Sequence, residues 1–335
     1  MYNDSQKVST GAPATSGRPL VSPTAIAAAA ALALAPAAVA DTSAPVEISN
    51  GTLSVAISPK GAELQSVRHD GCEYIWQGDP AYWDGRSPVL FPICGSLLEG
   101  KYTFGGREYS LPGHGFACRS DFRVERSPDG TRATFTLESD DATRAQYPFD
   151  FSLAIVFRLD GATLHVEATV RNTGTGTMPF AYGGHPGFNV PLGGEGTFED
   201  WFLEFAPGVC PDAFEFGKGT GLVTGRTRAF PLAAGNRLPL RHELFNGTGL
   251  FLDRVGGEVT LRSEKSPRAV TVRFPDMPYL GFWHSAGDNT PFLCIEPWGG
   301  LPSYVDVIDD FATRPHMVRL APGAAAKLRY SLTFR

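Results

Sequence analysis

The strongest constraint on the fold is an alternation of apolar and polar side chains with a period of two, which begins shortly after residue 45. Leu53, Val55 and Ile57 form the first such run, and the longer runs 149–159 and 162–171 repeat the pattern. Because successive side chains of a strand point to opposite faces, the pattern predicts strands with one buried face. Further strands are predicted at 131–138, 258–262, 269–274, 292–295 and 327–334.

Pairs of residues that favour chain reversal separate these runs. Asp160-Gly161 joins two long alternating runs directly, so we predict a β-hairpin there. Other pairs of this kind are Asn50-Gly51, Asp70-Gly71, Gly105-Gly106, Asp129-Gly130 and Gly256-Gly257. With 38 glycines and 27 prolines in the chain, we expect no long helix after residue 45, only short helical turns at 80–83 and 241–245.

Many short strands without a strand–helix–strand rhythm predict an all-β fold, an antiparallel β-sandwich or a barrel. No linker-like stretch interrupts residues 46–335, which are therefore expected to form one domain. Residues 1–45 differ: an alanine-rich stretch precedes Ala38-Val39-Ala40 and Asp41. This segment resembles a signal peptide cleaved after Ala40, but a disordered extension or a wrongly chosen start also fits. Localisation therefore stays open between cytoplasmic and exported, or periplasmic.

Composition excludes several classes of function. A net charge of −6 with scattered Lys and Arg argues against a nucleic-acid partner. The alanine-rich stretch is too short and weakly apolar to span a membrane. The five cysteines show neither metal-binding spacing nor a disulfide framework, and Cys94 and Cys294 lie in apolar runs typical of buried thiols. No phosphate-binding loop or dinucleotide motif is present, so we predict no cofactor.

Three polar residues interrupt segments that are otherwise apolar or rich in glycine and proline. His114 lies in Leu-Pro-Gly-His-Gly-Phe, His185 in Gly-Gly-His-Pro-Gly-Phe-Asn, and Glu296 in Cys-Ile-Glu-Pro-Trp-Gly-Gly. Glycines allow a backbone to approach a ligand, and a carboxylate that ends a buried strand must be paired, solvated or raised in pKa. Taken singly, each residue fits an ordinary loop or ion-pair role. Zinc binding by the three together is possible in principle, but without local ligand spacing we predict no metal.

These three motifs, in this order, resemble those of the aldose 1-epimerase (galactose mutarotase-like) family, in particular its bacterial branch found beside sugar-utilisation genes. The segments 87–95 and 278–283 are also similar to family segments, so the resemblance covers about residues 47–335. It implies a β-sandwich of the galactose mutarotase type, a monosaccharide substrate and a monomer or weak dimer. It also implies an isomerase that interconverts the α and β anomers of a sugar without a cofactor.

The resemblance implies roles for individual residues. Glu296 would be the base at the C1 hydroxyl and His185 the acid at the ring oxygen, while His114 would help to hold the sugar. Trp298 and Phe188 would stack on the sugar, whereas Trp283 is expected in the core. Further candidate substrate-binding residues are Arg86, Asn189 and Arg119.

Two departures from the family pattern bear on the substrate. Cys118 and Ser96 stand where relatives usually carry arginine, and in a strand the neighbouring Arg119 would point to the opposite face. Because phosphate recognition favours arginine, a neutral aldohexose such as glucose or galactose is the preferred substrate. The alternatives are a non-catalytic carbohydrate-binding protein on the same scaffold and a hexose-phosphate mutarotase.

Overall fold

The computed structural model describes residues 44–245 and 249–335. The expectations for the N-terminal segment therefore lie almost wholly outside the described residues. Among those residues, none of the helices has the length and apolar character needed to cross a membrane.

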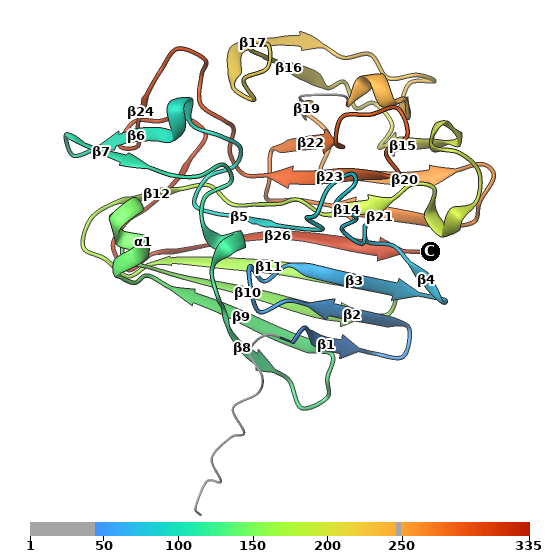
Figure 1. Cartoon of the computed structure of the whole chain (residues 1–335), viewed down its shortest axis with the longest axis horizontal. Coiled ribbons are helices and arrows are strands. Elements are labelled where there is room, and N and C mark those ends of the chain that lie inside the picture. Colours follow the sequence, from blue (N-terminus) through green and yellow to red (C-terminus); the bar gives the residue numbers. More distant parts are fainter. Residues whose placement is uncertain (1–43, 246–248) are drawn as a thin grey trace, which may run out of the picture. The chain divides into compact units, whose positions relative to one another are not determined.

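The largest sheet contains nine strands, and its long members carry the alternating runs (Figure 1). Strand β10 pairs with β11 in register from Phe151↔Asn172 to Asp160↔Thr163, which confirms the predicted hairpin. Gly161 has a φ of 53°, a backbone conformation that glycine adopts without steric cost. The strands, in spatial order, are β18 (Arg237–Pro239), β15 (Trp201–Phe205), β20 (Glu258–Ser263), β21 (Ala269–Arg273), β26 (Ala325–Phe334), β11 (Thr163–Asn172), β10 (Phe151–Asp160), β9 (Arg132–Glu138) and β8 (Arg123–Arg126).

A second large sheet carries the motifs that the sequence singled out. Its strands are shorter, and β14 pairs with β23 beside the main path of the sheet. In spatial order they are β17 (Val223–Ala229), β16 (Asp212–Phe216), β19 (Leu250–Asp253), β22 (Tyr279–Trp283), β23 (Phe292–Trp298), β13 (Gly183–Gly184) and β5 (Val89–Leu90), with β14 (Gly187–Asn189) off this path.

Three smaller sheets complete the described part. The four-stranded sheet begins at Val46. Among the named strands of the described residues, only β24 and β6 pair in parallel. The remaining strands are β1 (Val46–Ser49), β2 (Leu53–Ile57), β3 (Leu64–His69) and β4 (Cys72–Glu73) in one sheet, β24 (Asp309–Asp310), β6 (Lys101–Phe104) and β7 (Arg107–Ser110) in another, and β12 (Met178–Phe180) with β25 (Val318–Leu320).

One continuous apolar core joins the sheets. Ile155 of β10 and Leu332 of β26 come from the nine-stranded sheet, Leu280 and Ile295 from the second large sheet, and Val55 from the four-stranded sheet. All five side chains are fully buried. The two large antiparallel sheets thus pack around a shared interior, which confirms the predicted β-sandwich.

The turn predictions are confirmed with one exception. Asn50-Gly51, Asp70-Gly71, Gly105-Gly106 and Asp129-Gly130 each lie between two paired antiparallel strands. Gly256-Gly257 does not, because β19 before it and β20 after it belong to different sheets. The hairpin prediction for this pair is wrong: the two glycines serve a crossover between layers.

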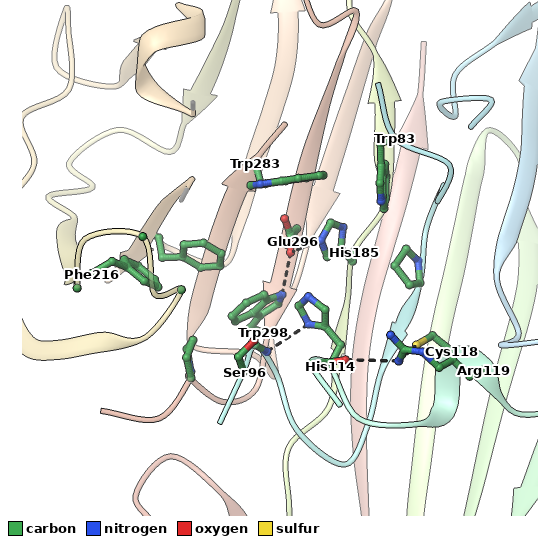
Figure 2. A pocket seen from close by; sticks show the side chains of 18 of the residues that line it. Trp83, Ser96, His114, Cys118, Arg119, His185, Phe216, Trp283, Glu296 and Trp298 are labelled. Carbon is green, nitrogen blue, oxygen red and sulfur yellow. Dashed lines mark hydrogen bonds and ion pairs between the residues drawn. The ribbon is translucent and has the colours of Figure 1, made fainter. Parts of the chain in front are cut away.

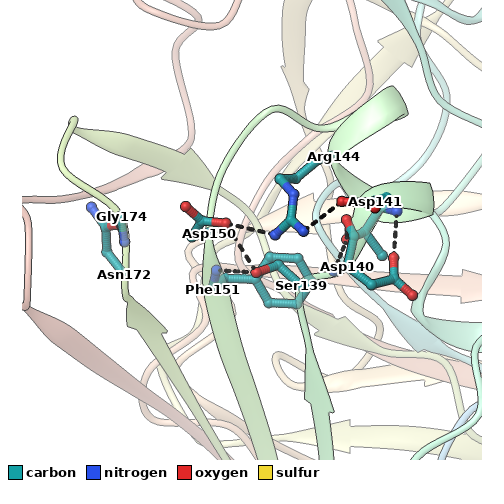
Figure 3. Close-up of polar contacts among 9 residues, drawn as sticks. Ser139, Asp140, Asp141, Arg144, Asp150, Phe151, Asn172 and Gly174 are labelled. Atoms are coloured by element: carbon teal, nitrogen blue, oxygen red, sulfur yellow. Dashed lines mark hydrogen bonds and ion pairs between the residues drawn. The ribbon is translucent and has the colours of Figure 1, made fainter.

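Helical structure is brief. A 3₁₀ helix at His242–Leu244 confirms one predicted turn, whereas 80–83 forms a hydrogen-bonded turn without a helix. Helix α1 (Asp141–Gln146) was not predicted, and a capping box starts it: Asp140 accepts from the Thr143 backbone, and Thr143 Oγ1 accepts from the Asp140 backbone. Arg144 of α1 contacts Asp150, which ties the helix to the start of β10 (Figure 3). The other 3₁₀ helices are Leu98–Gly100, Ala117–Arg119, Leu192–Gly194 and Phe198–Asp200.

Candidate active site

Strand β23 divides its side chains between the core and a cavity. Leu293 and Ile295 belong to the main core, whereas Glu296 and Trp298 line the cavity. This division follows from the period of two along a strand. Glu296 is fully buried, and its Oε2 accepts a hydrogen bond of 3.1 Å from Trp298 Nε1, two residues along on the same face.

His185 lies between β13 and β14, beside β23. Its Nε2 is 3.2 Å from Glu296 Oε2, and only 9% of its side chain is exposed. The glycines around it let the backbones come together: a Cβ on Gly183 would lie 3.0 Å from the Pro297 carbonyl oxygen. The sequence Gly-Gly-His-Pro-Gly therefore brings an imidazole into contact with a carboxylate from the next strand.

His114 reaches the same place from a tight loop. Its φ is 63°, a strained value for a residue with a Cβ, and three backbone hydrogen bonds hold the loop to Phe91 and Gly95. A Cβ on Gly115 would lie 2.2 Å from the Phe91 carbonyl oxygen, so this position requires glycine. The Gly95 N–H donates to His114 Nδ1 at 3.2 Å, which leaves Nε2 to carry the proton of the neutral ring.

Burial shifts the protonation of all three groups toward their neutral forms. It raises the pKa of Glu296 well above its ordinary value, with the Trp298 hydrogen bond acting in the opposite direction. It lowers the pKa of His185 well below the ordinary value, an effect that His114 reinforces. It also lowers the pKa of His114 to about 4, with a further contribution from Arg119. Within the described residues, Glu296 Oε1 and His185 Nδ1 are buried without a hydrogen-bond partner.

The three groups border a cavity of about 760 Å³, within the size range of small-molecule sites (Figure 2). Aromatic side chains form much of its wall. Trp83 and Trp283 lie 5.3 and 5.7 Å from His185 between ring centroids, and Phe251 lies 4.5 Å from Trp298. Such a cavity combines apolar faces that suit a sugar ring with an acid–base pair at its wall.

Comparison with known proteins identifies the family. The sequence model described as aldose 1-epimerase matches residues 45–308, more than half of the chain. The chain belongs to the aldose 1-epimerase family. LacX of Lactococcus lactis subsp. lactis, in its plasmid form, is 33% identical over 296 residues, which cover 86% of this chain and 98% of LacX.

Solved structures agree with the membership of this family. A galactose mutarotase-like protein from Lactobacillus casei has a TM-score of 0.82 and 34% identity, and the match covers 87% of this chain and 100% of that one. A galactose mutarotase related enzyme from Lactobacillus acidophilus has a TM-score of 0.81 and 32% identity over 87% and 97% of the two chains. Both relatives carry the β-sandwich described above, and family membership makes the chain one of a group of sugar epimerases.

Five of the eight site residues expected from the sequence of this epimerase-family chain border the cavity, namely His114, Arg119, His185, Glu296 and Trp298. The structure places the other three elsewhere. Arg86 donates to Gln65 Oε1 at 2.9 Å, and Asn189 donates to the carbonyl oxygens of Glu73 and Ile75. Phe188 is fully buried in the main core, because it alternates along β14 to the face opposite the cavity.

Arg119 does not point away from the cavity of this epimerase homologue, as its place next to Cys118 in an assumed strand had suggested. Ala117–Arg119 is a 3₁₀ helix, in which neighbouring side chains do not point to opposite faces. Cys118 and Arg119 both line the cavity. The Arg119 guanidinium donates to the Gly115 carbonyl at 2.9 Å, so it also supports the His114 loop. Ser96 lines the same wall.

Several cavity residues of the epimerase fold were missed or assigned to another role. Trp283 was expected in the core, yet it is partly exposed and lines the cavity. Trp83 comes from an irregular loop, Phe216 is the last residue of β16, and Lys218 lies in the connection between β16 and β17. Loops have no periodic pattern of apolar residues that would predict which side chains line a cavity. For Trp83, the one indication in the sequence was a tryptophan close to glycines.

A metal ion has one candidate position in the described part of this aldose 1-epimerase homologue. His185, Cys294 and Glu296 each offer a ligand atom within 4.8 Å of the others. Metal ligands must be deprotonated, whereas burial raises the pKa of the Cys294 thiol well above its usual range and that of Glu296 likewise. The Oε2 atom of Glu296 is also engaged by Trp298 and His185. These residues fit a hydrogen-bonded acid–base pair better than a cation site, and the absence of a metal stays a prediction.

Proposed function

We propose that the chain is a mutarotase that interconverts the α and β anomers of a neutral aldohexose, with Glu296 and His185 as its acid–base pair. The observation that carries this proposal is the 3.2 Å contact between the two groups at the wall of an aromatic cavity. The family is one of sugar epimerases, which supports the reaction class.

The proposed reaction moves one proton at each of two sugar oxygens. Glu296 takes the proton of the C1 hydroxyl while protonated His185 gives a proton to the ring oxygen, and the bond between C1 and the ring oxygen breaks. The aldehyde rotates about the C1–C2 bond. Ring closure then reverses both transfers: Glu296 returns its proton to the former aldehyde oxygen, and His185 takes one from the attacking hydroxyl.

The electrostatics support this cycle. The pair alternates between carboxylate with imidazolium and carboxylic acid with imidazole, and both states have no net charge. Burial raises the pKa of Glu296 and lowers that of His185, so it brings the two states closer in free energy than they are in water. The proton must pass through the sugar, so a bound sugar replaces the direct His185–Glu296 contact in this proposal.

Polarimetry tests the proposal. Freshly dissolved α-glucose or α-galactose should reach its equilibrium rotation faster with the protein, and Glu296→Gln and His185→Ala should each remove the acceleration. A folded protein that leaves both sugars at the buffer rate contradicts the proposal. Calorimetric sugar binding without any turnover would instead support a carbohydrate-binding protein on this scaffold.

One observation favours a second candidate, a hexose-phosphate mutarotase. Arg119 and Lys218 line the cavity, and neither forms an ion pair with a carboxylate within the described residues. Two cations without a carboxylate partner suit a phosphate group, although Arg119 also donates to the Gly115 carbonyl. Turnover of glucose 6-phosphate above that of glucose, reduced in both Arg119→Ala and Lys218→Ala, would establish this candidate. Equal or lower turnover of the phosphate ester excludes it.

A further inference from the structure

Trp83 belongs to none of the segments that carry the family resemblance, yet it contacts the centre of the site. Its ring centroid lies 5.3 Å from that of His185 and 5.4 Å from that of Trp283, and the two indoles are nearly perpendicular at 81°. Trp283 also lies edge-on to His185, at 5.7 Å. Figure 2 shows the two tryptophans on either side of the space beside His185 and Glu296.

The surrounding backbone provides a slot for this indole. A Cβ on Gly85 would lie 2.5 Å from Cζ2 of Trp83, and a Cβ on Gly187 would lie 3.1 Å from Cζ3. Neither glycine has a positive φ, so the backbone conformation does not demand glycine at these positions. The space that the two missing side chains leave is taken by Trp83.

The loop that carries Trp83 is fixed at several points. Trp76 Nε1 donates to the Trp83 carbonyl at 2.8 Å, and the Trp83 N–H donates to the Asp79 carbonyl at 2.9 Å. Further along, Glu63 Oε1 accepts from the backbone of Arg86 and Ser87, both at 3.0 Å. The indole is therefore held in place by contacts that lie outside the cavity.

Like Trp283, Trp83 contacts His185 and lines the cavity. It is partly exposed, whereas Glu296 is fully buried and His185 nearly so. The titratable groups that face His185 are Glu296 and Cys294 on β23 and His114 in the neighbouring loop. None of them shields the pair from water as a large apolar ring does.

We infer that Trp83 is a positioning residue, which fixes the His185 ring and excludes water from the His185–Glu296 pair. This inference rests on the proposed mutarotase function, but its physical content can be measured without turnover. Water near the pair would stabilise both charged end states, the pair with two protons and the pair with none. Removal of Trp83 therefore narrows the pH range over which the pair holds one proton, from both sides.

The experiment compares Trp83→Ala, Trp83→Phe and Tyr82→Ala in the full chain. Tyr82 is the matched control, because it lies in the same turn and contacts Trp76 but does not line the cavity. We expect Trp83→Ala to lower kcat about tenfold or more with a smaller change in KM. The plot of kcat against pH should narrow by about one pH unit on both the acidic and the basic side. Trp83→Phe should recover most of the pH range of activity, and Tyr82→Ala should have the same pH range as the parent.

A second readout separates this inference from the proposed function. Proton NMR of the His185 ring, assigned with His185→Ala, should show its titration moving toward neutral pH in Trp83→Ala. An unchanged titration, or equal narrowing in Tyr82→Ala, overturns the inference even if the protein is a mutarotase. A parent protein without activity refutes the proposed function, and the NMR comparison still decides the role of Trp83.

Discussion

The nine-stranded sheet and the sheet that carries the candidate site differ in the length of their strands and in the polar groups that they bury. In the first, β10 and β11 pair over ten residues each, and their inward side chains are apolar except for Asn172 at the end of β11. In the second, β13 has two residues and β14 three, and the strand between the core and the cavity buries a carboxylate. Both sheets contain buried polar atoms without a hydrogen-bond partner among the described residues, but only in the second do two such atoms, Glu296 Oε1 and His185 Nδ1, belong to side chains that contact each other. The long regular hairpin and the candidate acid–base pair therefore lie in different layers of one sandwich.

The largest expected effect comes from the site. Glu296→Gln keeps the shape of the side chain but cannot take a proton, so kcat should fall by about 10²–10⁴-fold. Because a buried carboxyl with a raised pKa disfavours folding above its unfolded pKa, the variant should be as stable as the parent or more stable at pH 7. Polarimetry and thermal unfolding measure the two effects. If Glu296→Gln lost stability as well as activity, the contrast between the two sheets would be contradicted.

A substitution in the core of the nine-stranded sheet should have the opposite result, a loss of stability without a loss of activity. Leu153 of β10 is fully buried and pairs with Val170 and Leu137. Leu153→Ala should reduce the free energy of unfolding by about 2–5 kcal/mol and leave kcat unchanged where the protein is folded. Arg158→Ala, at an exposed position of the same strand, is the control and should change stability by less than about 0.5 kcal/mol. Denaturant unfolding tests both variants.

A smaller effect concerns the pH dependence of stability. Burial lowers the pKa of His114 to about 4 from an ordinary value of 6.5, so its contribution to stability is complete above pH 6.5 and is lost as the pH falls toward 4. His114→Asn retains an acceptor for the Gly95 N–H but does not titrate. Its unfolding free energy should therefore decline less between pH 6.5 and 4 than that of the parent. Identical slopes would show that His114 is not held neutral.

The smallest effect sharpens the boundary of the site. Arg86 is tied to Gln65 rather than to the cavity, so Arg86→Ala should lower stability by about 1 kcal/mol and leave kcat unchanged. Arg119→Ala is its counterpart at the cavity wall and should raise KM for the sugar. If Arg86→Ala alone raised KM, the sequence-based assignment of Arg86 to substrate binding would be restored.

The same contrast explains what could be predicted from the sequence. Six of the nine strands in the large sheet could be predicted because alternation fixes both their extent and their buried face, as at 131–138 and 162–171. The short strands β8, β15 and β18 were not predicted. The motif residues His185 and Glu296 could be found because they interrupt apolar or glycine-rich runs. Neither of these two patterns identifies Trp83 or Lys218 as cavity residues, because both lie in loops whose paths depend on contacts between distant segments.

The misplaced residues have the same origin. Phe188 and Asn189 follow His185 closely in the sequence, but Phe188 is buried in the main core and the side-chain amide of Asn189 donates to the carbonyl oxygens of Glu73 and Ile75. The direction of the Arg119 side chain was predicted for a strand, whereas Ala117–Arg119 forms a 3₁₀ helix. Proximity along the chain identifies a motif, and only the fold decides which of its side chains share a surface.

Strand β26 has a consequence for how the protein is made. It lies between β21 and β11 in the middle of the nine-stranded sheet, although it is the last strand along the chain. A growing polypeptide on the ribosome cannot close this sheet until residue 334 has emerged, so until then the edge of β11 that pairs with β26 stays open. During that interval the nascent chain is a substrate for chaperones, and expression yield should respond to their supply more than the stability of the finished sandwich suggests.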